Sequence, residues 1–356
     1  MTRVVSAVTV LPPHRYEQAE ITAAVADRLG LSGQKRAMLE RFHAASGVRS
    51  RHLVLPLEDY RRITDFRQAN DAFLASATDL GEQAVKEALA HVGLLPTDVD
   101  VLMTVSVTGI GAPSIDARLV SRLGLRDDVR RIPVFGLGCV AGAAGVARLH
   151  DVLRGEPDGV AVLLAAETCS LTVQSNDDST ANLVASALFG DGVAAVVLVG
   201  ADRAGRLGRP GPDVIDTRSR LYPDTERVMG WDIGGSGFRI VLAASVADVV
   251  EAHLGDDVRR FLDTHGLSLA DVRRWIAHPG GPKVLEATAR ALDLRDGELG
   301  VTWQSLAEVG NLSSASVLHV LSRTMEKSPP DSGSAGVLFA MGPGFCSELV
   351  LLRWPS

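Results

Sequence analysis

The chain has 356 residues, of which 46% are hydrophobic, so it can bury the core of one large domain or of two domains of ordinary size. A formal net charge of -7 argues against general nucleic-acid binding, and the apolar runs are too short to span a bilayer. We therefore expect a cytoplasmic protein that neither binds nucleic acid nor inserts into a membrane.

Strand and helix patterns alternate along the chain. Residues 71–92 have a helical pattern, whereas 99–107 and 160–166 are short runs rich in valine, leucine or alanine that are typical of buried strands. This alternation predicts an α/β fold.

A segment rich in glycine, proline and arginine interrupts the alternation a little past the midpoint, at residues 200–213. We interpret it as the connection between two halves. The predicted domains are residues 1–205 and residues 206–356.

The two halves share a sequence pattern. Gly93 and Gly266 each begin a Gly-Leu turn that is followed by Asp-Val and a buried strand, and they lie about 173 residues apart. The same offset brings Cys139 to within a residue of Asn311, and both open a helix of small residues. An internal duplication would therefore direct both residues towards one central cavity.

The three cysteines lack paired spacing, which fits a reducing compartment and gives no CxxC metal site, so no metal is expected. Cys139 lies where a strand pattern turns through glycines into an Ala/Gly helix. A helix N-terminus favours thiolate over thiol. Cys139 is therefore predicted to be a nucleophile that carries an acyl group on sulfur, whereas Cys346 is expected to be inert.

His278 follows a strand pattern and precedes Pro-Gly-Gly, at the strand end where α/β folds place catalytic groups. A histidine there can hold a proton or stabilise an anion. A packed or surface histidine is the alternative interpretation.

Four motifs occur in a specific order and spacing: Gly-Cys before the Ala/Gly helix, His before Pro-Gly-Gly, Gly-Asn-Leu-Ser-Ser, and a near-terminal Gly-Pro-Gly. Together they resemble the bacterial type III polyketide synthases of the chalcone synthase superfamily. The motif residues are Cys139, His278, Asn311, Gly342, Pro343 and Gly344.

The resemblance implies a duplicated thiolase-like fold with αβαβα layers, a homodimer, acyl-CoA and malonyl-CoA as substrates, and a Cys139, His278 and Asn311 triad. In that chemistry Cys139 attacks the starter thioester, with its pKa lowered by His278 and the helix dipole. His278 and Asn311 then stabilise the enolate left by decarboxylation of malonyl-CoA. No metal or redox cofactor is implied.

Further positions match substrate-binding positions of the family, although each also has an ordinary packing or solvated interpretation. Phe189 and Phe238 match the phenylalanines between the CoA tunnel and the cavity. The remaining matches are cavity residues (Thr172, Ser313, Met229 and Cys169) and basic residues near the CoA phosphates (Arg49 and Arg51).

Ala112 stands where plant enzymes have a methionine that crosses the dimer interface, so we expect a wider cavity. The motifs look most like those of bacterial alkylpyrone and alkylresorcinol synthases, which suggests a fatty acyl starter, malonyl or methylmalonyl extension, and α-pyrone or resorcinol products. The alternatives are a synthase of small aromatics from malonyl-CoA alone or a short starter, an enzyme like ketoacyl-acyl-carrier-protein synthase III, and a non-catalytic acyl-CoA-binding homologue.

Overall fold

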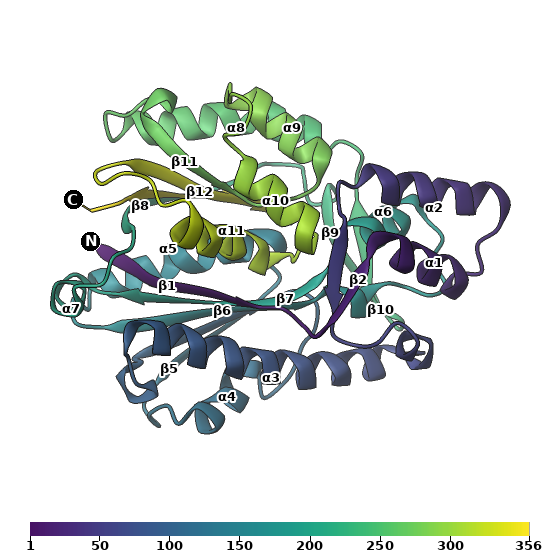
Figure 1. Cartoon of the computed structure of the whole chain (residues 1–356), viewed down its shortest axis with the longest axis horizontal. Coiled ribbons are helices and arrows are strands. Elements are labelled where there is room, and N and C mark those ends of the chain that lie inside the picture. The colour runs from purple at the N-terminus through teal and green to yellow at the C-terminus, as the bar shows by residue number, and fades with distance from the viewer. Residues whose placement is uncertain (356) are drawn as a thin grey trace.

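The computed structural model describes residues 1–355 and shows the predicted α/β architecture in layers. Helices α5 (Ala141–Arg154) and α11 (Ser314–Lys327) lie between two parts of a β-sheet (Figure 1). Helices α3 (Phe66–Val92) and α4 (Ile115–Leu123) cover one outer face, and α8 (Val246–Asp263) and α9 (Pro282–Ala291) cover the other. This is the predicted αβαβα arrangement.

The four strands of the second half repeat the order of four strands in the first half, and β5 has no counterpart. The sheet runs β5-β4-β6-β7-β1 in the first half and β11-β12-β13-β8 in the second. The first-half strands are β1 (Thr2–Val10), β4 (Val101–Ser106), β5 (Arg130–Phe135), β6 (Val160–Thr168) and β7 (Asp191–Val199). The second-half strands are β8 (Asp213–Leu221), β11 (Val272–Ala277), β12 (Ala335–Gly342) and β13 (Cys346–Arg353).

Strand directions correspond as well. The pair β4 and β6 is parallel, as is the pair β11 and β12, whereas β7 and β13 run antiparallel to both of their neighbours. Helix α5 is followed by β6 and helix α11 by β12, which occupy equivalent places in the two halves. The duplication inferred from the repeated pattern is therefore visible in the topology.

The halves join edge to edge where β1 meets β8. Thr2 pairs with Val214 and Arg3 with Asp213, which makes one nine-stranded sheet. The Arg3 guanidinium also donates to Asp213 at 2.7 Å. The predicted linker, residues 200–213, contains a short helix, α7 (Ala201–Leu207), before this junction.

A third group of elements packs beside the two halves, at the right of Figure 1. It contains three helices, α1 (Gln18–Arg28), α2 (Gly33–Ala45) and α6 (Thr180–Leu188). It also contains the antiparallel pair of β2 (His14–Glu17) with β3 (Ser50–Leu53) and the hairpin of β9 (Met229–Gly234) with β10 (Gly237–Leu242). Helix α10 (Gly300–Val309) leads from the second half into α11.

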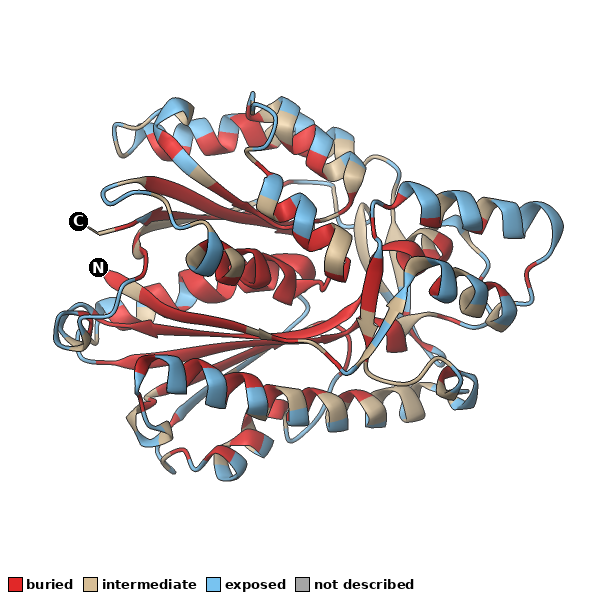
Figure 2. Ribbon diagram, in the orientation of Figure 1, coloured by how far each residue is buried: buried red, intermediate tan, exposed pale blue. Residues whose placement is uncertain are grey.

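The central layer is the most buried part of the molecule (Figure 2). Helix α5 carries alanine and glycine over its first turns and is buried on most sides, as is α11. A Cβ atom on Gly142 would lie 2.3 Å from the carbonyl oxygen of Ser314. The two helices approach so closely because glycine occupies the contact.

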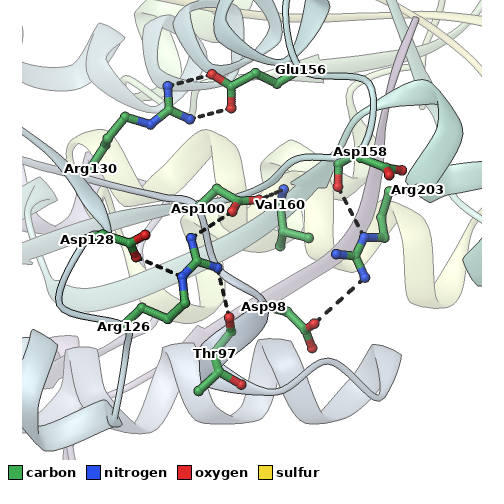
Figure 3. Close-up of polar contacts among 10 residues, drawn as sticks. All are labelled: Thr97, Asp98, Asp100, Arg126, Asp128, Arg130, Glu156, Asp158, Val160 and Arg203. Carbon is green, nitrogen blue, oxygen red and sulfur yellow. Dashed lines mark hydrogen bonds and ion pairs between the residues drawn. The ribbon is translucent and has the colours of Figure 1, made fainter.

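An ion-pair cluster joins the amino ends of the first-half strands (Figure 3). Arg126 donates to Asp128 at 2.8 Å and to Asp100 at 3.0 Å, and Asp100 accepts from the Val160 N–H. These contacts connect the starts of β4 and β6. They lie at the end of the sheet opposite to the carboxyl ends of these strands, and catalytic groups are expected at the carboxyl ends.

In the described residues, no helix is long and apolar enough to cross a membrane.

The Gly142 contact yields a stability prediction. Gly142→Ala should lower the free energy of unfolding by about 1–3 kcal/mol, because the added methyl forces α5 and α11 apart. Gly205→Ala is the matched control on α7, where a Cβ meets nothing within 4 Å, and it should be neutral or stabilising by about 0.5–1 kcal/mol. Urea denaturation measures both, and equal effects would contradict the packing account.

Candidate active site

Cys139 lies in the predicted strand, turn and helix. Strand β5 ends at Phe135, Gly136 and Gly138 have φ angles of 100° and 58°, and α5 follows. A Cβ on Gly138 would come within 2.6 Å of Pro343. Gly138 therefore permits both the left-handed turn and the close approach of the Gly-Pro-Gly loop from the second half.

His278 follows β11, and its backbone N–H donates to Phe339 O at 3.0 Å. Its Nδ1 is buried and has no hydrogen-bond partner among residues 1–355. The other ring nitrogen, Nε2, is thus the one available to a ligand.

Asn311 lies between α10 and α11. Its Oδ1 accepts from the Ser313 N–H at 2.8 Å and from Ser316 Oγ at 3.3 Å. These bonds fix the amide oxygen and leave Nδ2 as a donor. Ser313 has a φ of 50°, which is unfavourable for a residue with a side chain, and such conformations gather at functional sites.

Phe189 is joined to Asn311 across the two halves. The Asn311 N–H donates to Leu188 O at 2.8 Å, and the Gly190 N–H donates to Asn311 O at 3.0 Å. These backbone bonds hold Phe189 next to Asn311.

One cavity of about 380 Å³ brings the predicted residues together. Cys139, His278, Asn311 and Phe189 all line it. Most other lining residues are apolar, and Lys283 is the single charged one in the part of the chain described. The volume lies at the lower end of the range of ligand sites, about 300–1,000 Å³.

A smaller inner cavity of about 40 Å³ also reaches Cys139. Its walls include Cys169, Ser313 and Pro343, as well as Met229 and Trp231 of the β9–β10 hairpin. The Cys139 thiol donates to Ser313 Oγ at 3.8 Å. Cys139 therefore borders two cavities, the larger outer one and the smaller inner one.

Burial opposes charge on both reactive groups. Burial raises the pKa of the Cys139 thiol to about 12, against the opposing hydrogen bond with Ser313, and the nearby Glu167 raises it further. Burial lowers the pKa of His278 to about 3. The sequence-based expectation of a lowered thiol pKa is wrong for the resting site, because desolvation outweighs the favourable contacts.

Glu167 was missed by sequence reasoning. It is the penultimate residue of β6 and is completely buried. Its carboxylate accepts from Thr108 Oγ1 at 2.8 Å, from the Val107 N–H at 3.2 Å and from the Ser314 hydroxyl. It therefore ties the carboxyl end of β4 to the start of α11. A glutamate directly after an apolar strand run was the available signal.

Several predicted substrate residues do not line either cavity at Cys139. Phe238 is buried against Phe66 and Trp231, with ring centroids 5.2 and 5.9 Å apart, so it supports the inner wall from behind. Thr172 donates to Cys169 O at 2.7 Å, and Gly342 packs where a Cβ would lie 2.8 Å from the Val140 nitrogen. They and Gly344 support the site rather than face it.

The two predicted phosphate contacts differ from each other. Arg49 is exposed, as a phosphate contact requires. Arg51 is only 2% exposed, and its Nη1 donates to Phe189 O at 2.7 Å. Its burial is incompatible with the predicted contact to a solvent-facing phosphate.

Ala112 lies in an exposed stretch and does not line a cavity at Cys139 within the described chain. Lys283 and Trp231 are lining residues that sequence reasoning missed. Lys283 directly follows the Pro-Gly-Gly-Pro run after His278, and this proximity was the signal for it.

Comparisons with known proteins agree with this geometry. The chain matches the N-terminal domain of chalcone and stilbene synthases over residues 4–203 and their C-terminal domain over residues 214–355. It is 57% identical to the 1,3,6,8-tetrahydroxynaphthalene synthase of Streptomyces peucetius subsp. caesius, covering 99% of this chain and 93% of that protein. It is 33% identical to the Streptomyces coelicolor enzyme of the same name, covering 98% and 91%.

The crystal structure of the tetrahydroxynaphthalene synthase from Streptomyces coelicolor A3(2), a bacterial type III polyketide synthase, superposes with a TM-score of 0.93 at 30% identity and covers 99% of each chain. The fold and cavity are thus those of a decarboxylating condensing acyltransferase. The chain belongs to the chalcone and stilbene synthase family and is a type III polyketide synthase.

The opposed pKa values generate a prediction about thiol reactivity. At any pH between about 3, the pKa of His278, and about 12, the pKa of Cys139, the resting site holds a neutral thiol and a neutral imidazole. Transfer of the proton from thiol to imidazole takes up or releases no proton from solvent, so the fraction of the reactive thiolate does not depend on pH in this range. Alkylation of Cys139 by iodoacetamide should therefore be nearly independent of pH between about pH 6 and 9. In His278→Ala the rate should rise about tenfold per pH unit, because only solvent then removes the proton. Parallel pH profiles of the two proteins would contradict this coupling.

Proposed function

We propose that this type III polyketide synthase builds a small aromatic product from malonyl-CoA alone, with the growing chain loaded on Cys139 before each extension. The observation that carries the proposal is the small size of the inner cavity, about 40 Å³, whose walls include Met229 and Trp231. Together with the outer cavity of about 380 Å³, it offers limited room for a long acyl chain. The 57% identity to a tetrahydroxynaphthalene synthase supports the same conclusion.

In the loading step, the thiol proton passes from Cys139 Sγ to His278 Nε2 as sulfur attacks the thioester carbon. Thiolate and imidazolium form together, so their attraction offsets part of the desolvation that each would meet alone. The tetrahedral intermediate collapses with expulsion of the CoA thiolate, which takes a proton from solvent, so the His278 imidazolium keeps its Nε2–H for the extension step. The acyl group remains on sulfur.

In the extension step, malonyl-CoA loses CO₂ and the electron pair moves onto the thioester oxygen. The donors available there are His278 Nε2 and Asn311 Nδ2. The enolate carbon then attacks the acyl carbon on Cys139, which expels the Cys139 thiolate and leaves the extended chain as a CoA thioester. That thioester reloads onto Cys139 before the next extension. Loss of either donor would cost roughly 100- to 1000-fold in rate, as for other oxyanion sites.

A fatty acyl starter is the second candidate. It is favoured by Ala112, whose small side chain leaves space if a partner subunit contributes this segment, and by the apolar walls of the outer cavity. Such an enzyme would release alkylated α-pyrones or resorcinols, with malonyl or methylmalonyl extension.

We further propose a homodimer. Strand β5 is an edge of the sheet, and Phe135 at its end and Ile110 nearby are 45% and 44% exposed. Exposed apolar groups at an open strand edge favour association with a second copy.

No metal or redox cofactor is part of the proposed reaction, because loss of CO₂ drives carbon–carbon bond formation and hydrogen bonds stabilise the enolate.

The product assay distinguishes the two candidates. Purified enzyme should convert malonyl-CoA alone into a polyhydroxylated aromatic, and addition of acyl-CoA starters from acetyl to long-chain should not increase turnover. Mass spectrometry of the products measures this, with Cys139→Ala as an inactive control. Alkylated pyrones or resorcinols from long starters would support the second candidate instead.

Lys283 supplies a separate prediction about substrate binding. It is exposed, lines the outer cavity, and could pair with a CoA phosphate. Lys283→Ala should raise KM for malonyl-CoA about tenfold with little change in kcat, because one charge-assisted contact is lost. Lys327→Ala, at the end of α11, is the matched control. An unchanged KM, or a drop in kcat alone, would contradict this assignment.

A further inference from the structure

A second cavity of about 350 Å³ lies behind Phe189 and does not contain Cys139, His278 or Asn311. Helix α1, β3 with the segment that follows it, and the loop after β6 form it. Its walls are largely apolar and comprise Ile21, Ala24, Val25, Leu29, Leu53, Leu57, Val173 and Phe189. Such walls suit a hydrocarbon body.

Acidic and basic side chains surround its exposed part. Asp27 and Arg61 approach to 3.9 Å between α1 and the segment after β3, and Glu58 is exposed beside them. The two carboxylates at this opening disfavour a highly charged anion.

Arg51 is a buried cationic residue in the wall of the cavity. Nη1 donates to Phe189 O at 2.7 Å, but Nε and Nη2 are buried without any hydrogen-bond partner among residues 1–355. Burial lowers the pKa of Arg51 only to about 10, so the guanidinium stays charged at neutral pH. Unpartnered donors on a buried cation are costly unless an acceptor is supplied.

The neighbouring carboxylate of Asp191 does not supply an acceptor for these Arg51 donors. Asp191 attracts Arg51 electrostatically, but its oxygens accept from the Ser170 N–H and hydroxyl and from the Val54 N–H. The Tyr60 hydroxyl bonds Ser170 Oγ at 2.5 Å. Arg28, a second partly buried cation of the cavity, lies 5.9 Å from the Tyr60 ring. The interior therefore has basic groups in excess of free acceptors.

We propose that this cavity binds a small apolar carboxylate whose oxygens accept from Arg51 and whose hydrocarbon part packs on the apolar walls. A planar carboxylate matches the two unpartnered donors of the guanidinium, which have no exposed surface and must turn towards the cavity for the ligand to reach them. Phe189 lines this cavity and both cavities at Cys139, so the bound carboxylate contacts a ring shared with the condensing site. The proposal does not depend on which starter or product the enzyme uses.

Isothermal titration of the wild-type protein with hexanoate and with hexanol tests the proposal. Both probes have the same hydrocarbon chain, but only hexanoate carries the charge that Arg51 requires. Hexanoate should bind at least about tenfold more tightly than hexanol, which corresponds to one charge-assisted hydrogen bond to a buried partner.

A cavity-filling variant locates the site. Ala24 lines the cavity, whereas Ala23 on the same helix is exposed and does not. Ala24→Phe should weaken hexanoate binding at least about tenfold, and Ala23→Phe should leave it within about twofold. Replacing Arg51 itself is unsuitable, because its stem packs against Gly190 and Gly310 and its loss could unfold the region.

Three results would overturn the proposal: no hexanoate binding, equal binding of hexanoate and hexanol, or full binding by Ala24→Phe. Full binding by Ala24→Phe would show that hexanoate binds elsewhere, such as in the cavity at Cys139.

Discussion

The contact between α5 and α11 is the constraint on which the site depends. Gly142 allows the backbone of α5 to meet the Ser314 carbonyl, and the two helix starts then face the same space. Cys139 precedes one helix and Asn311 the other, so packing of the central layer sets the separation of nucleophile and amide. The same contact joins the two halves of the duplicated fold, so stability and catalysis rest on one interface.

Burial gives this interface its chemistry. The thiol and imidazole at the cavity are both neutral when alone, since the pKa of Cys139 is raised and that of His278 is lowered. The negative charge of the enolate is therefore stabilised by hydrogen-bond donors of the protein instead of by water. Such donors are already in position and need no reorganisation during the reaction. Glu167 contributes from behind, by holding the start of α11 against the end of β4.

The sequence predicted the features that are written locally. The strand, turn and helix around Cys139, the strand-end position of His278 and the repeat that pairs Cys139 with Asn311 each follow from short patterns. Features that depend on long-range packing were not predictable. Arg51 is buried because Gly190 and Gly310 leave room for its stem, and no local pattern shows that these segments meet.

The hairpin β9–β10 gives a similar lesson. Phe238 was predicted to face the substrate, but it packs on Trp231, and Trp231 lines the inner cavity. Both residues lie in a hairpin whose orientation over Cys139 is set by the rest of the fold. The same limit applies to the predicted wide cavity: Ala112 indicates space at one position, whereas cavity size is the sum of all walls.

Release of labelled CO₂ from malonyl-CoA by Cys139→Ala and Asn311→Ala tests the central claim most directly. If Asn311 stabilises the enolate and Cys139 only holds the acyl chain, Cys139→Ala should still decarboxylate malonyl-CoA without condensing it. Asn311→Ala should lose decarboxylation by roughly 100- to 1000-fold. Equal CO₂ release by the two variants, or full release by Asn311→Ala, would contradict the division of labour derived from this site.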